Sequence, residues 1–193
     1  MPAKPEPGDP AAATEAGAPA GSVSVLATTD AGATTGPVIA DPRLRKLSFT
    51  GSTEVGRTLV EASAAQLLRV SMELGGNAPF IVLADADLDA AVDGAMLAKM
   101  RNMGEACTAA NRFLVHESLA AEFTGRLAER MAALVVGRGV EDGVDVGPLI
   151  DAASREKVAG LVSDAVDRGA TVVTGGTPVG QRGYFYAPTV LAD

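Results

Sequence analysis

The chain has 193 residues, 47% of them hydrophobic, which supplies apolar material for one substantial core or two small ones and excludes a wholly disordered chain. Its 24 acidic and 16 basic side chains give a formal charge of -8, so nucleic acid would be repelled and is not expected as a partner. A single cysteine and a single histidine exclude an internal disulfide and argue against a metal site, and a lone thiol favours the reducing cytoplasm.

The first half of the chain predicts a lead-in followed by strands and helices in alternation. Residues 1–22 are dominated by Pro, Ala, Gly and Glu, a composition that predicts a flexible lead-in. Short β-branched or apolar runs then predict strands over residues 23–26, 44–49, 70–74 and 80–83. Apolar residues at helical spacing predict an amphipathic helix over residues 53–68. This layout is typical of a parallel sheet with crossover helices.

The second half continues the alternation. Carboxylates at residues 85–89 precede a helical pattern that runs to about Asn102, and a strand is predicted over residues 113–115. Two long helices are predicted over residues 119–134 and 152–168, and a strand over residues 171–174 ends at two glycines. The chain stops just after an apolar run over residues 184–191, so we expect a domain that is cut short.

The first segment that could carry chemistry reads Phe49-Thr-Gly-Ser-Thr-Glu-Val-Gly56 and joins a predicted strand to a predicted helix. Free backbone N–H groups at a helix start can hold a diphosphate, and glycine lets it approach closely. The spacing is not the dinucleotide fingerprint with three glycines, so a structural capping turn fits the segment about equally well.

The second segment, Met72-Glu-Leu-Gly-Gly-Asn77, places Glu73 at the end of a predicted strand. A carboxylate at a strand end, with its pKa raised by partial burial, is suited to act as a general base. Most glutamates in such places are simply solvated or cap a turn, and that alternative stays open.

The third segment, Arg101-Asn-Met-Gly-Glu-Ala-Cys107-Thr-Ala-Ala-Asn-Arg112, holds the only cysteine. A thiol in a glycine-containing loop flanked by two arginines is a candidate nucleophile, because positive charge and nearby N–H groups favour the thiolate. The alternative is a small buried hydrophobe, as most lone cysteines are. His116 could pair with Cys107 as in a thiol hydrolase, although a surface histidine is the simpler interpretation.

Taken in order, these three segments resemble the aldehyde dehydrogenase superfamily, and their order and spacing are more specific than any one motif. The resemblance runs from about residue 15 to Asp193. It includes Gly147-Pro148-Leu149 and the segment 183–189, Gly-Tyr-Phe-Tyr-Ala-Pro-Thr, which it identifies as a strand.

The resemblance implies a cofactor, NAD or NADP, and the residues that hold it. Gly51 and Ser52 would lie against the diphosphate, and Leu74 would contribute to cofactor binding. Lys4, in a Lys-Pro pair similar to the family's adenosine-ribose segment, is a further candidate.

The resemblance also implies the mechanism. Cys107 thiolate would attack the aldehyde to give a thiohemiacetal, whose oxyanion is held partly by the Cys107 backbone N–H. After hydride transfer to the cofactor, Glu73 would deprotonate the water that hydrolyses the resulting thioester. Arg101 looks like the arginine of the succinate-semialdehyde branch, where a guanidinium fork grips the distal carboxylate of the substrate, although pairing with a nearby acid would explain it as well.

The sequence therefore predicts an α/β, parallel-sheet, aldehyde dehydrogenase-like fold truncated at both ends. A flexible lead-in over 1–22 would precede a partial NAD(P)-binding domain over 23–76 and a partial catalytic domain over 77–193, with Glu73 and Cys107 at their cleft. The resemblance implies a small-molecule aldehyde, succinate semialdehyde, as the substrate. It also implies a homo-oligomer if the chain is complete. No stretch reaches the roughly 20 apolar residues of a membrane helix, so no membrane partner is expected. The alternative is a catalytically inactive remnant that binds a nucleotide or a partner.

Overall fold

The computed structural model describes residues 10–193, so Lys4 lies outside the described residues. The chain divides into two compact units, Met1–Leu74 and Gly75–Asp193, and each is described by itself. Among the described residues, none of the helices combines the length and the apolar character that a membrane crossing needs.

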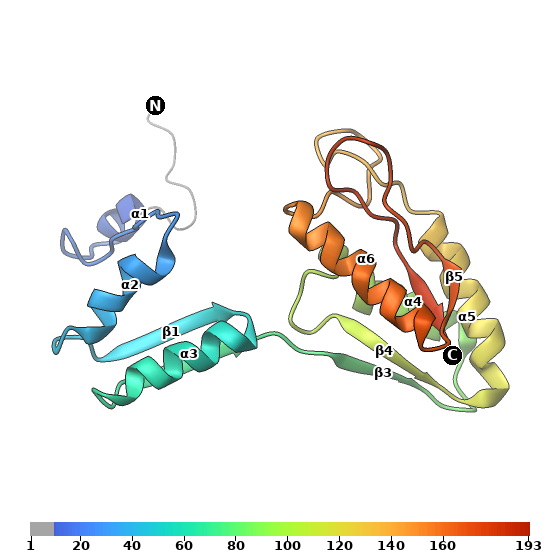
Figure 1. Ribbon diagram of the computed structural model, residues 1–193, viewed down its shortest axis with the longest axis horizontal. Coiled ribbons are helices and arrows are strands. Elements are labelled where there is room, and N and C mark those ends of the chain that lie inside the picture. Colours follow the sequence, from blue (N-terminus) through green and yellow to red (C-terminus); the bar gives the residue numbers. More distant parts are fainter. Residues whose placement is uncertain (1–9) are drawn as a thin grey trace. The chain divides into compact units, whose positions relative to one another are not determined.

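The first unit is built around one strand-helix-strand motif (Figure 1). Strands β1 (Lys46–Gly51) and β2 (Arg69–Leu74) are parallel, and α3 (Thr53–Ala64) connects them. Two further helices precede the motif, α1 (Pro10–Glu15) and α2 (Ala31–Ala40). Because parallel neighbours need a crossover connection, α3 lies along the strand pair that it joins.

Close packing at one glycine seats α3 on the strand pair. A Cβ atom at Gly56 would lie 2.6 Å from Leu74 Cδ2, so a larger residue there would displace the Leu74 side chain from its place against the helix. At the other end of α3, Gln66 Nε2 donates to the Ile39 carbonyl at 2.8 Å and ties the helix to α2. These contacts hold the carboxyl ends of β1 and β2 beside the start of α3.

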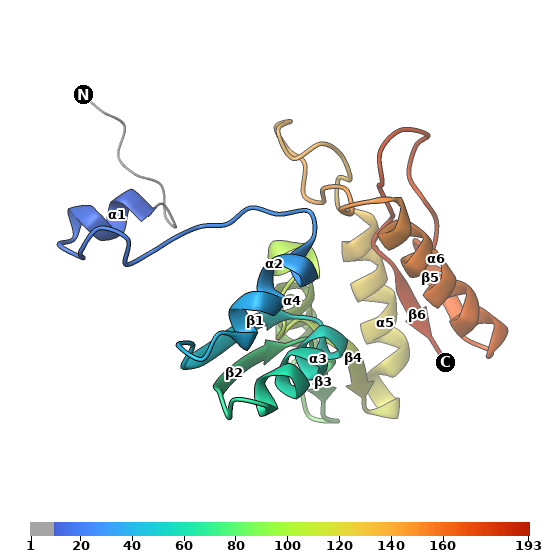
Figure 2. The same cartoon turned by 60° about the vertical axis from the view of Figure 1, so that its left-hand side comes forward.

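The second unit repeats the motif and adds a hairpin-like pair. Strands β3 (Ala78–Val82) and β4 (Ala110–Val115) are parallel, and their connection contains α4 (Leu88–Met100) and the 3-10 helix η1 (Arg101–Gly104). Helices α5 (Glu117–Ala132) and α6 (Ala152–Asp167) follow, and then β5 (Thr171–Thr174) and β6 (Val190–Ala192), which pair antiparallel. Figure 2 shows α5 standing between the β3–β4 pair and the β5–β6 pair.

The core of the second unit lies where α4 and α5 cover the β3–β4 pair. Its buried members are Val82, Val92, Ala95, Phe123, Leu127 and Met131. The Phe123 ring lies 6.5 Å from the Phe80 ring and 6.1 Å from the Phe113 ring, centre to centre, which is the range of favourable aromatic pairs. Asp87 starts α4 by accepting the Ala90 N–H at 3.0 Å.

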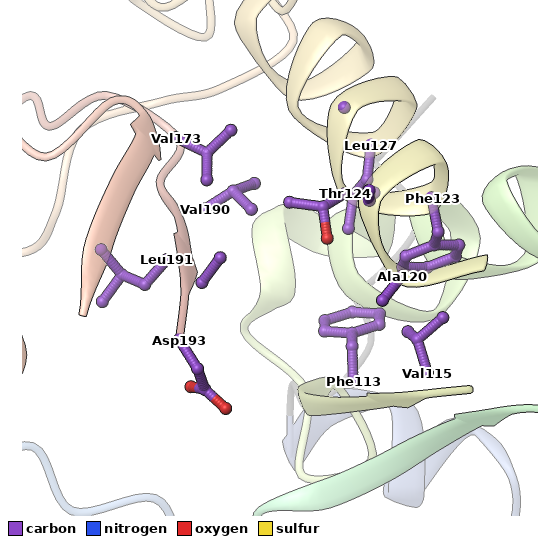
Figure 3. A pocket seen from close by; sticks show the side chains of 13 residues that line it. Phe113, Val115, Ala120, Phe123, Thr124, Leu127, Val173, Val190, Leu191 and Asp193 are labelled. Carbon is purple, nitrogen blue, oxygen red and sulfur yellow. The ribbon is translucent and has the colours of Figure 1, made fainter. Parts of the chain in front are cut away.

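A cavity of about 500 Å³ opens beside this core, between β4, α5 and the β5–β6 pair. Figure 3 shows Phe113 and Val115 of β4 on one side and Val190 and Leu191 of β6 on the other, with Phe123 of α5 near the strand. The β4 and β6 strands therefore do not pair with each other across this gap.

The structure agrees with most predicted elements and corrects two. The prediction of a strand over residues 23–26 is wrong: these residues have no regular structure and no strand partner among residues 10–193, and their apolar side chains are exposed. The strand implied over residues 183–189 is wrong as well, since only Val190–Ala192 forms β6. There Gly183 has a φ of 77° and Pro188 has no N–H to donate. The β5–β6 pair is antiparallel, whereas the β1–β2 and β3–β4 pairs are parallel as predicted.

Helix α2 was not predicted, because its ten residues include two glycines, two threonines and Pro37. It begins because Asp30 accepts the Ala33 N–H at 2.9 Å, a cap that compensates for weak helix formers. Within the predicted lead-in, residues 10–15 form α1, which buries no residue.

Phe123→Ala should destabilise the second unit by about 3–5 kcal/mol, because the ring is only 1% exposed and its removal leaves a cavity between two other rings. Leu97 of α4 is 67% exposed, so Leu97→Ala should change the free energy of unfolding by less than about 0.5 kcal/mol. Urea denaturation of the two variants and the wild type measures both values. Equal losses would mean that Phe123 is not the centre of this core.

Candidate functional site

The turn after β1 has the form of a helix cap. Ser52 Oγ accepts the Val55 N–H at 3.2 Å, so the hydroxyl satisfies one of the free donors at the start of α3. Gly51 and Ser52 are both exposed at the carboxyl end of β1. The structural capping role is confirmed, and the diphosphate role remains a prediction.

Glu73 and Leu74 lie beside that turn, at the carboxyl end of β2. The parallel register places Thr50 opposite Glu73 and Gly51 opposite Leu74. The Glu73 carboxylate is exposed and has no hydrogen bond or ion pair among residues 10–193, whereas the Leu74 side chain packs on Gly56. The first unit thus gathers the turn and the candidate base at one sheet edge, the edge where parallel sheets usually bind ligands.

Cys107 lies in the loop between η1 and β4 and is exposed. The alternative of a buried small hydrophobe is therefore wrong for this thiol. The Ala109 N–H donates to the Ala106 carbonyl at 2.9 Å and closes a turn around Cys107, while Ala109 and Ala110 are buried. The loop thus exposes the thiol to solvent, while the residues that follow it are buried.

Gly104 must be glycine for this loop to form. Its φ is +80°, and a Cβ atom there would lie 2.9 Å from the Lys99 carbonyl oxygen. Lys99 itself donates from Nζ to Asn111 Oδ1 at 2.6 Å, and burial lowers the pKa of its ammonium group. These contacts join the end of α4 to the start of β4 across the loop.

A second glycine, which sequence reasoning missed, controls the backbone of Cys107. A Cβ atom at Gly76 would lie 3.0 Å from the Cys107 carbonyl oxygen. Next to it, Arg112 Nη2 donates to the Asn77 carbonyl at 3.1 Å. The segment before β3 and the loop before β4 therefore touch, and Arg112 is engaged by a carbonyl.

Arg101 differs from Arg112 in being free. Its side chain is exposed, and among residues 10–193 it makes no hydrogen bond or ion pair. It lines a pocket of about 200 Å³ together with Ala106 and Thr108, the two neighbours of Cys107. The predicted alternative, pairing with a nearby acid, is thus not observed within the described residues.

His116 is exposed, as the simpler interpretation predicted, and the alternative thiol-imidazole pairing is excluded. His116 follows the carboxyl end of β4, where its Nδ1 lies 2.9 Å from Ser118 Oγ at the start of α5, whereas Cys107 precedes the amino end of β4. The six-residue strand between them is about 20 Å long, so the imidazole cannot reach the thiol. No group of three His, Cys, Asp or Glu side chains in residues 10–193 is arranged to hold a metal ion.

Comparison with known proteins identifies the relatives of this arrangement. The model of the aldehyde dehydrogenase family matches residues 11–193. A succinate-semialdehyde dehydrogenase of Paenarthrobacter nicotinovorans is 60% identical over 179 residues, which cover 93% of this chain and 40% of that protein. A glutarate-semialdehyde dehydrogenase of Pseudomonas aeruginosa is 49% identical over 181 residues, covering 94% of this chain and 37% of that protein.

The structural comparison agrees with the sequence comparison. The crystal structure of a succinate-semialdehyde dehydrogenase from Burkholderia pseudomallei superposes with a TM-score of 0.88 at 47% identity, covering 93% of this chain and 37% of that one. The predicted α/β fold of aldehyde dehydrogenase type is therefore confirmed. The chain spans about two fifths of the length of the relatives it matches.

Gly76→Ala should lower the free energy of unfolding by about 1–3 kcal/mol, because the new Cβ atom presses on the Cys107 backbone. The adjacent Gly75→Ala is the matched control, since a Cβ atom there meets nothing within 4 Å. Urea denaturation compares the two variants, and the amide chemical shift of Thr108 reports the Cys107 peptide group. A Thr108 shift that moves equally in both variants would contradict the close approach.

Proposed function

We propose that this chain, which belongs to the aldehyde dehydrogenase family, carries the nucleophile, the general base and the substrate anchor of an NAD(P)-dependent oxidation of succinate semialdehyde. The products would be the dicarboxylic acid and the reduced cofactor. The proposal depends on residues of both units, and each unit supplies its part at an exposed loop or sheet edge.

The free guanidinium of Arg101 is the observation that carries the choice of substrate. An exposed guanidinium with no internal partner can bind a carboxylate with two parallel hydrogen bonds. Since its pocket is also lined by Ala106 and Thr108, a carboxylate held there belongs to a molecule that reaches toward Cys107. An aldehyde with a carboxylate at its far end fits this arrangement.

The named relatives support the same chemical class. Two of them are semialdehyde dehydrogenases for succinate and glutarate, which are aldehydes that carry a distal carboxylate. A third, from Escherichia coli (strain K12), is a succinate-semialdehyde dehydrogenase that uses NADP(+) and is 47% identical over 181 residues. These names favour the short dicarboxylic semialdehydes, of which succinate semialdehyde is our choice.

The chemistry of the chain's own residues follows from this assignment. Cys107 thiolate adds to the aldehyde carbon, and the Cys107 N–H donates to the oxygen that becomes negative. Bound NAD(P)+ supplies the hydride acceptor, so the aldehyde carbon is oxidised while the carbon–sulfur bond remains. Glu73 then takes a proton from water, the water oxygen bonds to the acyl carbon, and the carbon–sulfur bond breaks to release the acid and restore the thiolate.

The cofactor would be held at the carboxyl edge of β1 and β2. The N–H groups in the first turn of α3, beside Gly51 and Ser52, are donors that suit a diphosphate, and Leu74 lies opposite Gly51 in the register. Ser52 Oγ is already used by the helix, so backbone donors would make most of the contact. Lys4, the cytoplasmic location and a homo-oligomer remain predictions.

Cys107→Ala should abolish cofactor reduction, because the variant cannot form the carbon–sulfur bond on which the oxidation depends. The purified chain is assayed with succinate semialdehyde and either NAD+ or NADP+ by the absorbance of the reduced cofactor. Circular dichroism checks that wild type and variant are folded. A folded wild-type chain that reduces neither cofactor would contradict the proposed activity of this polypeptide and favour an inactive remnant that binds a nucleotide or partner.

Arg101→Met should lower kcat/KM for succinate semialdehyde by about 10- to 100-fold, the value of one charge-assisted pair. Butanal has no carboxylate, so its kcat/KM should be unchanged. Arg182→Met is the matched control, because Arg182 is also exposed and without an ion pair in the described part of the chain. Equal losses for the two aldehydes would contradict a carboxylate-binding role.

A further inference from the structure

The loop that leads to Cys107 holds two non-glycine residues in the left-handed region of backbone conformation. Asn102 has a φ of 53° and Met103 a φ of 56°, and Gly104 follows at 80°. L side chains disfavour this region, and it persists only where surrounding contacts enforce it. The structure must therefore contain contacts that hold residues 102 and 103 in place.

Local hydrogen bonds account for Asn102. The Glu105 N–H donates to the Asn102 carbonyl at 2.9 Å, and Asn102 Nδ2 lies 3.4 Å from the Glu105 carbonyl. Asparagine is also one of the residues that tolerate the left-handed region best. Neither argument applies to Met103, whose side chain is long and unbranched.

Met103 is held instead by a contact with a distant part of the chain. The Gly147 N–H donates to Met103 Sδ at 2.9 Å, across 44 positions of sequence. Both residues are half-buried, and a Cβ atom at Gly147 would lie 3.4 Å from the same sulfur. A thioether is a weak hydrogen-bond acceptor, so the bond itself contributes little energy. The contact matters because it joins two segments that are far apart in the sequence.

The segment around Gly147 is firmly anchored on both sides. Before it, the Gly137 N–H donates to the Val146 carbonyl at 2.9 Å, and the Val146 N–H donates to the Val135 carbonyl at 3.0 Å. After it, the Leu149 N–H donates to the Tyr184 carbonyl at 3.0 Å. Met103 thus ties the Cys107 loop to a part of the second unit that is separate from α4 and β4.

We propose that Met103 is a positioning residue for Cys107, which holds the nucleophile loop in its left-handed conformation through the thioether contact with Gly147. The inference rests on the proposed role of Cys107 and adds the residue that fixes where the thiol is presented. Loss of the thioether would release the stretch between η1 and the buried Ala109, so that Glu105 and Cys107 could sample other conformations.

Amide hydrogen exchange measures the contact without reference to activity. In Met103→Leu the side chain keeps a similar volume and loses the acceptor, so exchange at Gly147 and Glu105 should become at least tenfold faster. The Leu149 amide, bonded to Tyr184, should exchange as in the wild type. Met96→Leu is the matched control: Met96 is a half-buried methionine of α4, and its substitution should change none of these amides.

The effect on the thiol is measured by alkylation with iodoacetamide, which reports Cys107 alone because the chain has one cysteine. The alkylation rate from pH 6 to 10 should change at least threefold in Met103→Leu and stay constant in Met96→Leu. With succinate semialdehyde, kcat should fall about tenfold while the KM for the aldehyde changes little. If Met103→Leu does not fold, Met103→Gly takes its place, because glycine adopts the left-handed conformation without strain and also lacks the sulfur. Exchange at Gly147 should then be faster in Met103→Gly as well.

Unchanged exchange at Glu105 together with an unchanged alkylation profile in a folded Met103 variant would overturn the proposal and reduce Met103 to a packing residue. A further outcome distinguishes failure of the proposed function from failure of the positioning role of Met103. If exchange and alkylation change as expected while the wild-type chain reduces neither cofactor, the proposed function fails and the positioning of Cys107 by Met103 stands.

Discussion

The parallel pairing of β3 with β4 is the constraint on which the presentation of Cys107 depends. Parallel neighbours begin at the same sheet edge, so the segments that precede them must be neighbours as well. In this chain those segments are Gly76–Asn77 and the Cys107 loop, and Ala78 stands opposite Ala110 in the register. The approach of Gly76 to the Cys107 carbonyl and the bond from Arg112 to Asn77 are consequences of that pairing.

The two units use opposite ends of their strand pairs. In the first, Gly51 and Glu73 lie where the parallel strands end, beside the start of α3. In the second, Cys107 lies where the strands begin, on a loop shaped by Gly104 and Met103. A helix start offers free N–H groups, which suit an anion, whereas an irregular loop can aim one side chain and one N–H at a reacting carbon. In the proposed reaction the first unit therefore binds the cofactor diphosphate, and the loop of the second unit carries the nucleophile.

The sequence predicted the regular elements well where local signals were strong. The helix predicted over residues 152–168 agrees closely with α6 (Ala152–Asp167), which Asp151 caps by accepting the Ser154 N–H at 2.7 Å. Residues 23–26 were predicted wrongly, because an apolar run becomes a strand only when another strand lies beside it, and pairing across the chain is not visible in a local pattern. The same limit explains why a strand was expected over residues 183–189.

The same limit separates the candidate site residues that the sequence indicated from those that it did not. The order of three motifs singles out Gly51, Glu73 and Cys107 as candidates, because each motif is local. Gly76 and Met103 were missed, since their importance comes from one contact each with a residue 31 and 44 positions away. No local pattern distinguishes a glycine in open space, such as Gly75, from one pressed against a carbonyl oxygen.

The two arginines that flank Cys107 differ in what the fold leaves them free to bind. Arg101 and Arg112 have the same charge and lie six and five positions from the thiol, so the sequence allowed both to favour the thiolate, and the resemblance implied substrate binding for Arg101 alone. The fold distinguishes them, because Arg112 donates to a backbone carbonyl, while Arg101 makes no internal hydrogen bond or ion pair in the described residues and borders a pocket. A guanidinium that is already engaged contributes little to substrate recognition, whereas a free one can pair with an incoming carboxylate. The proposed choice of substrate thus depends on which arginine the packing leaves free.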